Sequence, residues 1–121
     1  MLAAIPLQML KTSATLKVPQ EVGRWGERTD ETLALKKTHL QASNAVKKTR
    51  DSREVVLRAL LFYDVKNSLP RGVDFDVLKT RADEAGENMT LDINGLTYTV
   101  ETVEAIPDDR GLTHHYELGL T

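Results

Sequence analysis

The chain has 121 residues, a formal net charge of −2 and no cysteine. This length suits one domain that buries a core without disulfides or metal, so we expect a single domain over residues 1–121. The absence of cysteine excludes a disulfide framework and thiolate chemistry, and the slight acidity gives no general attraction to nucleic acid or to anionic membranes. No run approaches the roughly 18 apolar residues of a membrane span, so we expect no membrane partner.

Two strand patterns open the chain. Lys11–Val18 alternates between polar and mostly apolar residues, which predicts an antiparallel strand with one solvated face. Thr32–Gln41 carries further leucines, and the change of parity between Leu35 and Leu40 predicts a bulged or bent strand.

A polar and basic segment, Ser43–Glu54, follows, and we interpret it as a long, mobile loop. Five cations against two anions give the stretch Lys47–Arg58 a local charge of +3. Such a loop could contact phosphate with little sequence discrimination, or could be a solvated loop tip. The candidate contact residues for a DNA channel or a partner are Lys47, Lys48, Arg50 and Arg53.

The most hydrophobic segment is Val55–Asp64, whose periodicity also suits a helix. Its β-branched and aromatic content favours a strand that is buried on both faces. Further on, Phe75–Gly86 could hold one helical turn or two, with Gly86 as the stop signal.

Asn94-Gly95 is the strongest hairpin signal in the chain, because a two-residue type I′ turn needs positive φ at both central positions. The pairs that this turn predicts place apolar or aromatic residues on one face and polar residues on the other. These pairs are Ile93 with Leu96, Leu91 with Tyr98, and Met89 with Val100.

A last alternating run, Thr113–Thr121, continues from Leu112. It places on one side Leu112, His114, Tyr116, Leu118 and Leu120. In total the pattern gives six or so short strands with regular turn signals. It predicts an all-β fold, a small antiparallel or mixed β-barrel with long loops and at most one short helix.

Histidines in the last run raise the question of a metal site. Successive strand residues point to opposite faces, so we expect His114 inward and His115 at the surface, unable to share one ion. His115 and Glu117 share a face, with His39 as a conceivable third ligand. Stable sites need three or four ligands with a supporting second shell, so we assign no metal here.

The sequence offers little other chemistry. Asp74-x-Asp76 lacks the glycine and further acids of a calcium loop, so we interpret it as a solvated turn. No serine has a G-x-S-x-G setting and no glycine-rich phosphate loop follows a strand. We therefore expect no catalytic residues, no cofactor and no enzymatic activity.

Four blocks of the sequence stand out together: Ile5-Pro6 with Leu10 and Ser13, Leu61–Ser68, Ile93–Val100 and His114–Leu118. In this order and spacing they resemble the small minor capsid proteins of tailed phages and prophages of Gram-positive bacteria, which are similar to head-completion (stopper) proteins of the head–tail connector. The resemblance spans about Ile5 to Leu120, and the stretch Arg71–Gly86 departs from it by being longer and more acidic.

This resemblance implies a small β-barrel that assembles as a ring below the portal, keeps packaged DNA in the head and offers a surface to the tail. The implied partners are further copies of the chain, the portal or an adaptor ring, tail proteins and, if the basic loop faces the channel, double-stranded DNA. The implied location is the virion, with the bacterial cytoplasm during assembly. No catalytic residue is carried over, because the family has none.

Two other classes stay open at the level of sequence. One is a nucleic-acid-binding barrel of the oligonucleotide-binding type, although stacking aromatics are scarce near the basic loop. The other is a metal-dependent enzyme that uses His39, His115 and Glu117.

Overall fold

The computed structural model describes residues 7–20, 30–49 and 51–121. Over these ranges the chain forms strands, one α-helix and a short 3-10 helix, η1 (Leu7–Met9). In chain order the other elements are β1 (Thr12–Pro19), β2 (Asp30–Ala42), β3 (Val46–Lys48), β4 (Glu54–Val56), β5 (Ala59–Asp64), α1 (Phe75–Ala85), β6 (Thr90–Ile93), β7 (Leu96–Pro107) and β8 (Thr113–Leu120).

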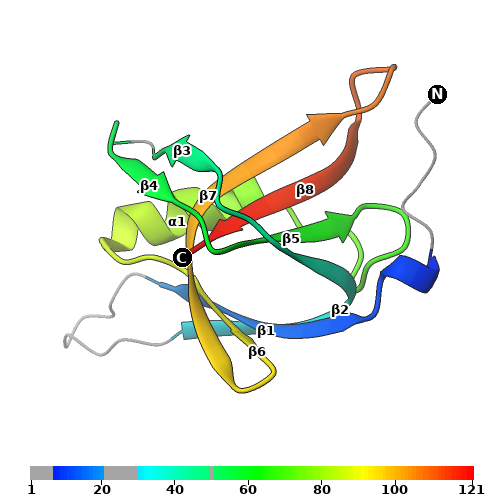
Figure 1. Ribbon diagram of the computed structural model, residues 1–121, viewed down its shortest axis with the longest axis horizontal. Coiled ribbons are helices and arrows are strands. Elements are labelled where there is room, and N and C mark those ends of the chain that lie inside the picture. Colours follow the sequence, from blue (N-terminus) through cyan, green and yellow to red (C-terminus); the bar gives the residue numbers. More distant parts are fainter. Residues whose placement is uncertain (1–6, 21–29, 50) are drawn as a thin grey trace.

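Six strands form a closed barrel in the order β1-β2-β5-β8-β7-β6 (Figure 1). All of their pairings are antiparallel, and β6 pairs with β1 to complete the closure. Closure removes the free edges that an open sheet would present to other chains. The predicted all-β barrel with a single short helix is therefore confirmed.

The hairpin of β6 and β7 has the predicted register. Asn94 and Gly95 form its turn with φ values of 50° and 81°. Leu96 is the exception to the predicted burial, since it lies beside the turn and is 54% exposed. The confirmed pairs are Ile93 with Leu96, Leu91 with Tyr98, and Met89 with Val100.

The bulge predicted in the second strand is also present. Lys37 has a φ of 57°, and the register between β1 and β2 shifts opposite it. Because the bulge changes the parity of β2, both Leu35 and Thr38 are buried.

Two predictions around the basic segment are wrong. Ser43–Glu54 is not a long loop, because it contains β3 and the start of β4, which pair with each other. Nor is Val55–Asp64 one strand buried on both faces. The chain leaves β4 after Val56 and enters β5 at Ala59, where alternate residues are only half-buried. The strands β3 and β4 have only three residues each, which is too short for an alternation of apolar and polar residues to show. The sequence pattern therefore could not reveal them.

Backbone hydrogen bonds continue the β2–β5 ladder into these short strands. The N–H of Ser43 donates to the carbonyl of Arg58 at 3.0 Å, and the N–H of Leu57 donates to the carbonyl of Ala45 at 2.9 Å. Residues 30–64 thus make one long hairpin whose outer part, β3 and β4, lies beside β7 (Figure 1).

The helix α1 has 11 residues and is longer than the one or two turns predicted. Asp74 caps its N-terminus, where Oδ1 accepts from the N–H groups of Asp76 and Val77 at 3.1 and 3.2 Å. Gly86 ends the helix at a φ of 78°, as the sequence predicts.

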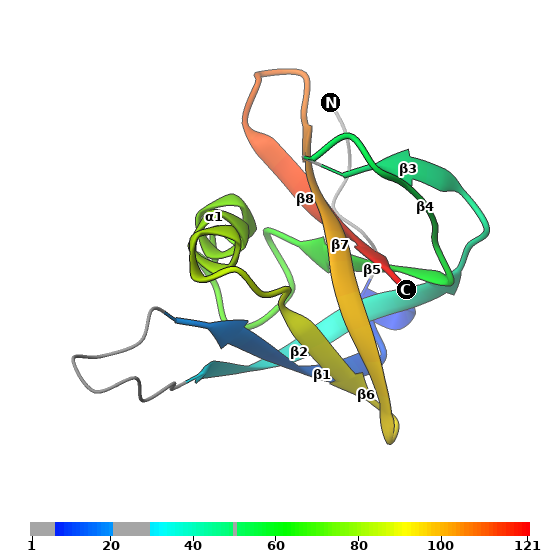
Figure 2. The same cartoon turned by 90° about the vertical axis from the view of Figure 1, so that its left-hand side faces the viewer.

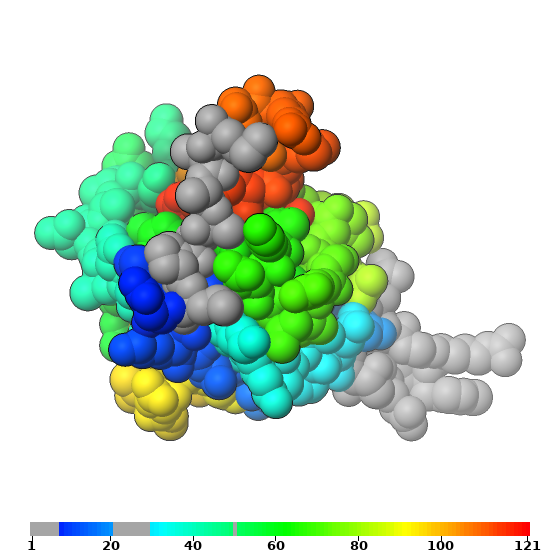
Figure 3. Space-filling model, turned by 90° about the vertical axis from the view of Figure 1, so that its right-hand side faces the viewer, coloured from blue at the N-terminus to red at the C-terminus, as the bar shows by residue number. Residues whose placement is uncertain are grey.

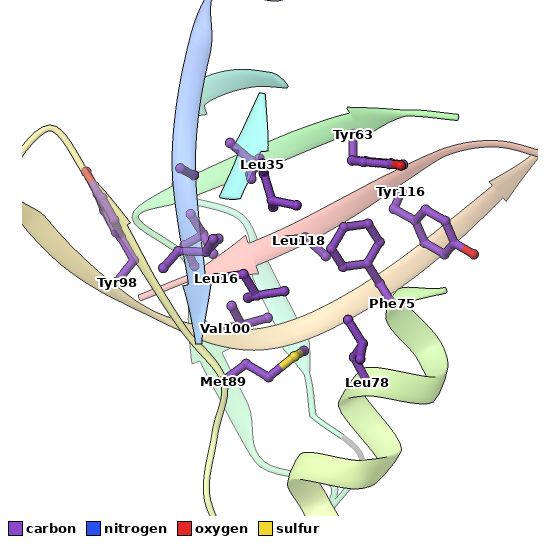
Figure 4. Packing of buried hydrophobic residues seen from close by; sticks show 14 of the residues in the cluster. Leu16, Leu35, Tyr63, Phe75, Leu78, Met89, Tyr98, Val100, Tyr116 and Leu118 are labelled. Atoms are coloured by element: carbon purple, nitrogen blue, oxygen red, sulfur yellow. The ribbon is translucent and has the colours of Figure 1, made fainter. Parts of the chain in front are cut away.

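The helix belongs to the core and is not an appended insertion. It packs against β1 and β7. Figure 4 shows Phe75 and Leu78 directed from α1 into the cluster around Tyr116 and Leu118. The ring centroid of Phe75 lies 4.8 Å from that of Tyr63 and 5.0 Å from that of Tyr116, and both contacts are edge-to-face.

Candidate interaction site

The β3–β4 hairpin (residues 46–56) is attached to the outside of the barrel. Lys47 Nζ lies 3.0 Å from Glu104 Oε1 of β7, and Arg53 Nη2 lies 3.8 Å from Glu101 Oε2 of the same strand. At its base, Leu57 is buried against β8, where a Cβ added to Gly119 would lie 3.0 Å from Leu57 Cδ1. Charge and packing therefore hold the hairpin against β7 and β8.

The four predicted contact cations have different surroundings. Lys47 and Arg53 are paired with acids of β7, and Lys48 is exposed. Arg50 lies outside the described residues. Glu101 and Glu104 neighbour this segment only in the fold, so the local charge along the sequence did not reveal them.

The tip of the hairpin is stabilised by its own polar contacts. Arg53 Nε lies 3.0 Å from Asp51 Oδ2, and the hydroxyl of Thr49 donates to Asp51 Oδ1. The Thr49 hydrogen bond, with Arg53 as a further cause, holds the pKa of Asp51 below its usual value. These contacts join Thr49, Asp51 and Arg53 to one another at the tip.

The two faces of the hairpin differ. Lys47 and Val55 form a pair on the face that leans on β7, as the ion pair of Lys47 shows. Strand alternation then places the pairs on either side of it on the opposite, outer face. These outer pairs are Val46 with Val56 and Lys48 with Glu54.

A polar cleft of about 490 Å³ separates the hairpin tip from the C-terminal end of α1. Lys79 contributes a buried ammonium to the cleft, 2.7 Å from Asp83 Oδ1. Two cations and four carboxylates line it, so the hairpin tip and the acidic residues at the C-terminal end of α1, Asp83 and Glu87, share one cleft within a single chain. The lining residues are Thr49, Asp51, Arg53, Lys79, Asp83, Gly86, Glu87, Asn88 and Glu101.

The histidine prediction for β8 is wrong in one respect. The register of β7 and β8 shifts between Ile106 and Pro107, which leaves His114 as an extra residue in β8. The bulge breaks strand alternation, and His114 Nδ1 lies 2.8 Å from His115 Nδ1. The two imidazoles are therefore neighbours rather than residues of opposite faces.

The third conceivable ligand does not join them. His115 Nε2 lies 2.9 Å from Glu117 Oε2, as their shared face predicts. The Phe62 ring lies between His39 and His115, with centroid distances of 5.7 and 5.9 Å. Across the described ranges, no group of three or more His, Cys, Asp or Glu side chains is arranged to hold a metal ion.

Where the structure describes the chain, none of the large apolar side chains that are exposed is aromatic. The same ranges contain no helix with the length and apolar composition that a bilayer crossing requires. Comparison with protein-family models, with curated proteins and with solved structures found no match.

Proposed function

We propose that the protein is a structural component of a tailed phage or prophage virion, the head-closure part of the head–tail connector. One observation carries the proposal. Three of the four blocks that resemble this family fall on β5, on the β6–β7 turn and on β8. The β5 and β8 blocks pair directly, from Leu61 with Leu118 to Asp64 with His115. The β6–β7 block lies further along, and it meets β8 where Val100 pairs with Leu120. The proposed role is to assemble as a ring on the portal and to retain packaged DNA.

The architecture supports this role physically. A closed barrel is a rigid base, and its projecting turns are free to meet partners. Leu96 beside the β6–β7 turn and Leu112 beside the β7–β8 turn are 54% and 64% exposed. Exposed leucines at opposite ends of β7 suit contacts with two different rings, the portal or adaptor on one side and a tail protein on the other.

Assembly and channel closure need no catalytic group or cofactor, so the proposed protein is not an enzyme. It would be present in the bacterial cytoplasm during assembly and in the virion afterwards. In the ring, packaged DNA would meet the channel-facing turns through phosphate contacts without base specificity.

The test is to measure the mass of the protein in solution by light scattering, alone and with the cognate portal. We expect a ring-sized increase in mass on the portal, and filled heads that keep their DNA only when the protein is present. A stable monomer with no affinity for the portal and nanomolar binding to short single strands would overturn the proposal in favour of an oligonucleotide-binding barrel.

A further inference from the structure

The outer face of the β3–β4 hairpin presents two valines side by side. Val46 and Val56 are paired across the hairpin and are 60% and 63% exposed. The next outer pair, Lys48 and Glu54, adds one cation and one anion to the same face. A directly paired, exposed apolar couple on a projecting hairpin is more typical of a contact surface than single scattered apolar residues are.

A second surface, on α1, is complementary to this face. A hollow of about 380 Å³ is lined in part by Val77, which is 53% exposed, and its two carboxylates outnumber its one cation. Its lining residues are Asp76, Val77, Thr80, Arg81 and Glu84. Val77 thus contributes apolar surface to a hollow that two acids also line. Its one cation, Arg81, is paired with Glu31 of β2.

One charged side chain on each surface is available for pairing. Within the described part of the chain, neither Lys48 nor Glu84 takes part in an ion pair. This contrasts with Lys47 and Arg53 on the same hairpin, whose partners are on β7.

The two surfaces lie on different sides of the molecule. Figure 2 shows α1 and the β3–β4 hairpin on opposite sides of the β7–β8 pair. In Figure 3 the blue-green surface of the hairpin is at the left and the yellow-green surface of α1 is at the right. One chain therefore cannot satisfy its own pair of surfaces, but two copies can.

We propose that the outer face of the β3–β4 hairpin of one copy docks into the α1 hollow of the next copy. Val46 and Val56 pack against Val77, and Lys48 approaches Glu84. The contact is heterologous, because it joins two different surfaces. Each copy that binds therefore leaves one surface free at either end of the assembly, and copies continue to add until a ring closes. This inference rests on the proposed ring and names the surfaces that would build it.

Disulfide cross-linking gives a direct test, because the natural chain has no cysteine. A chain carrying both Val46→Cys and Val77→Cys, oxidised at high concentration with and without portal, should yield a ladder of dimers, trimers and larger species. Each single variant should stay monomeric, and a mixture of the two should stop at dimers. Dimers from Val46→Cys alone would indicate a two-fold contact and overturn the proposal.

The matched control is the pair Val77→Cys with Leu96→Cys, because Leu96 is equally exposed but lies beside the β6–β7 turn. It should give no ladder.

Charge reversal supplies a second readout. Lys48→Glu should slow the cross-linking of the cysteine pair roughly fivefold, and adding Glu84→Lys should restore it. Lys66→Glu, at an exposed lysine after β5, should have no effect.

The outcomes separate this inference from the proposed function. If the protein forms rings on the portal but the cysteine pair gives no ladder, the docking contact is wrong and the connector role stands. If the ladder forms but the portal is not bound, the contact stands and the connector role is wrong. Absence of both overturns both.

Discussion

Gly119 is the residue that lets the base of the β3–β4 hairpin rest on the barrel. A Cβ at this position would collide with the Thr102 hydroxyl and crowd Leu57. We therefore expect Gly119→Ala to lower the free energy of unfolding by about 1–3 kcal/mol, the usual cost of overpacking. Urea denaturation measures the change. Adding Thr102→Ala should recover part of the loss, and a Gly119→Ala protein as stable as the natural one would contradict this packing.

Tyr63 makes stability depend on pH at the alkaline end. Its side chain is 1% exposed and its hydroxyl donates to the Pro70 carbonyl, and burial raises its pKa above the usual value of about 10. The folded state thus prefers the neutral phenol. The contribution is fully present below about pH 10 and is lost as pH rises through the folded pKa.

Unfolding free energies measured between pH 8 and 12 check this expectation. The natural protein should lose stability above about pH 10. Tyr63→Phe should be less stable at neutral pH, because it loses the hydrogen bond, and should show a shallower alkaline decline. Equal slopes for the two proteins would contradict the assignment. Burial also raises the pKa of Tyr116. Tyr116 would therefore account for the pH dependence that remains in the Tyr63→Phe variant.

At the scale of elements, the β6–β7 turn sets the register of a barrel wall. Gly95 has a φ of 81°, where an alanine would cost about 1–2 kcal/mol. We expect Gly95→Ala to lower the unfolding free energy by about that amount in urea denaturation. Asn94→Gly is the control, because glycine accepts positive φ without strain. Equal losses in both variants would show that side-chain contacts, and not backbone conformation, govern this turn.

The elements that could be predicted from the sequence are those specified by residues close together in the chain. The β6–β7 register follows from Asn94-Gly95, and the bulge in β2 follows from a change of parity between Leu35 and Leu40. The strands β3 and β4 carry no such signal. Their stability comes from hydrogen bonds that continue the β2–β5 ladder and from contacts with β7, which are non-local.

In the candidate site, too, features set by neighbouring residues were predictable, and features set by contacts between distant segments were not. The sequence indicated the cations of the β3–β4 hairpin but not their acids, since Glu101 and Glu104 lie about fifty residues further on. It also placed His114 and His115 on opposite faces, because an alternation rule cannot foresee a bulge. Residue types were therefore predictable, whereas their pairing depended on strand register.

For the whole molecule, the arrangement of charge matters more than the net value of −2. Lys47 and Arg53 are held by β7, and the cleft beside them contains more carboxylates than cations. A single copy thus offers DNA little uncompensated positive charge at this site. Any retention of DNA by the proposed ring would come from many copies acting together around a channel, because each contributes few phosphate contacts.

This view predicts weak binding of DNA by the isolated protein. With Lys47 and Arg53 paired and no exposed aromatic among the described residues, we expect dissociation constants weaker than about 10⁻⁴ M for short single and double strands at physiological salt. Fluorescence anisotropy of labelled oligonucleotides measures them. The variant Glu101→Gln/Glu104→Gln frees Lys47 and leaves Arg53 paired only with Asp51. It should therefore bind more tightly, with a steeper dependence on salt. Tight binding of single strands by the natural monomer, unchanged in that variant, would show that another surface recognises nucleic acid and would weigh against a connector role.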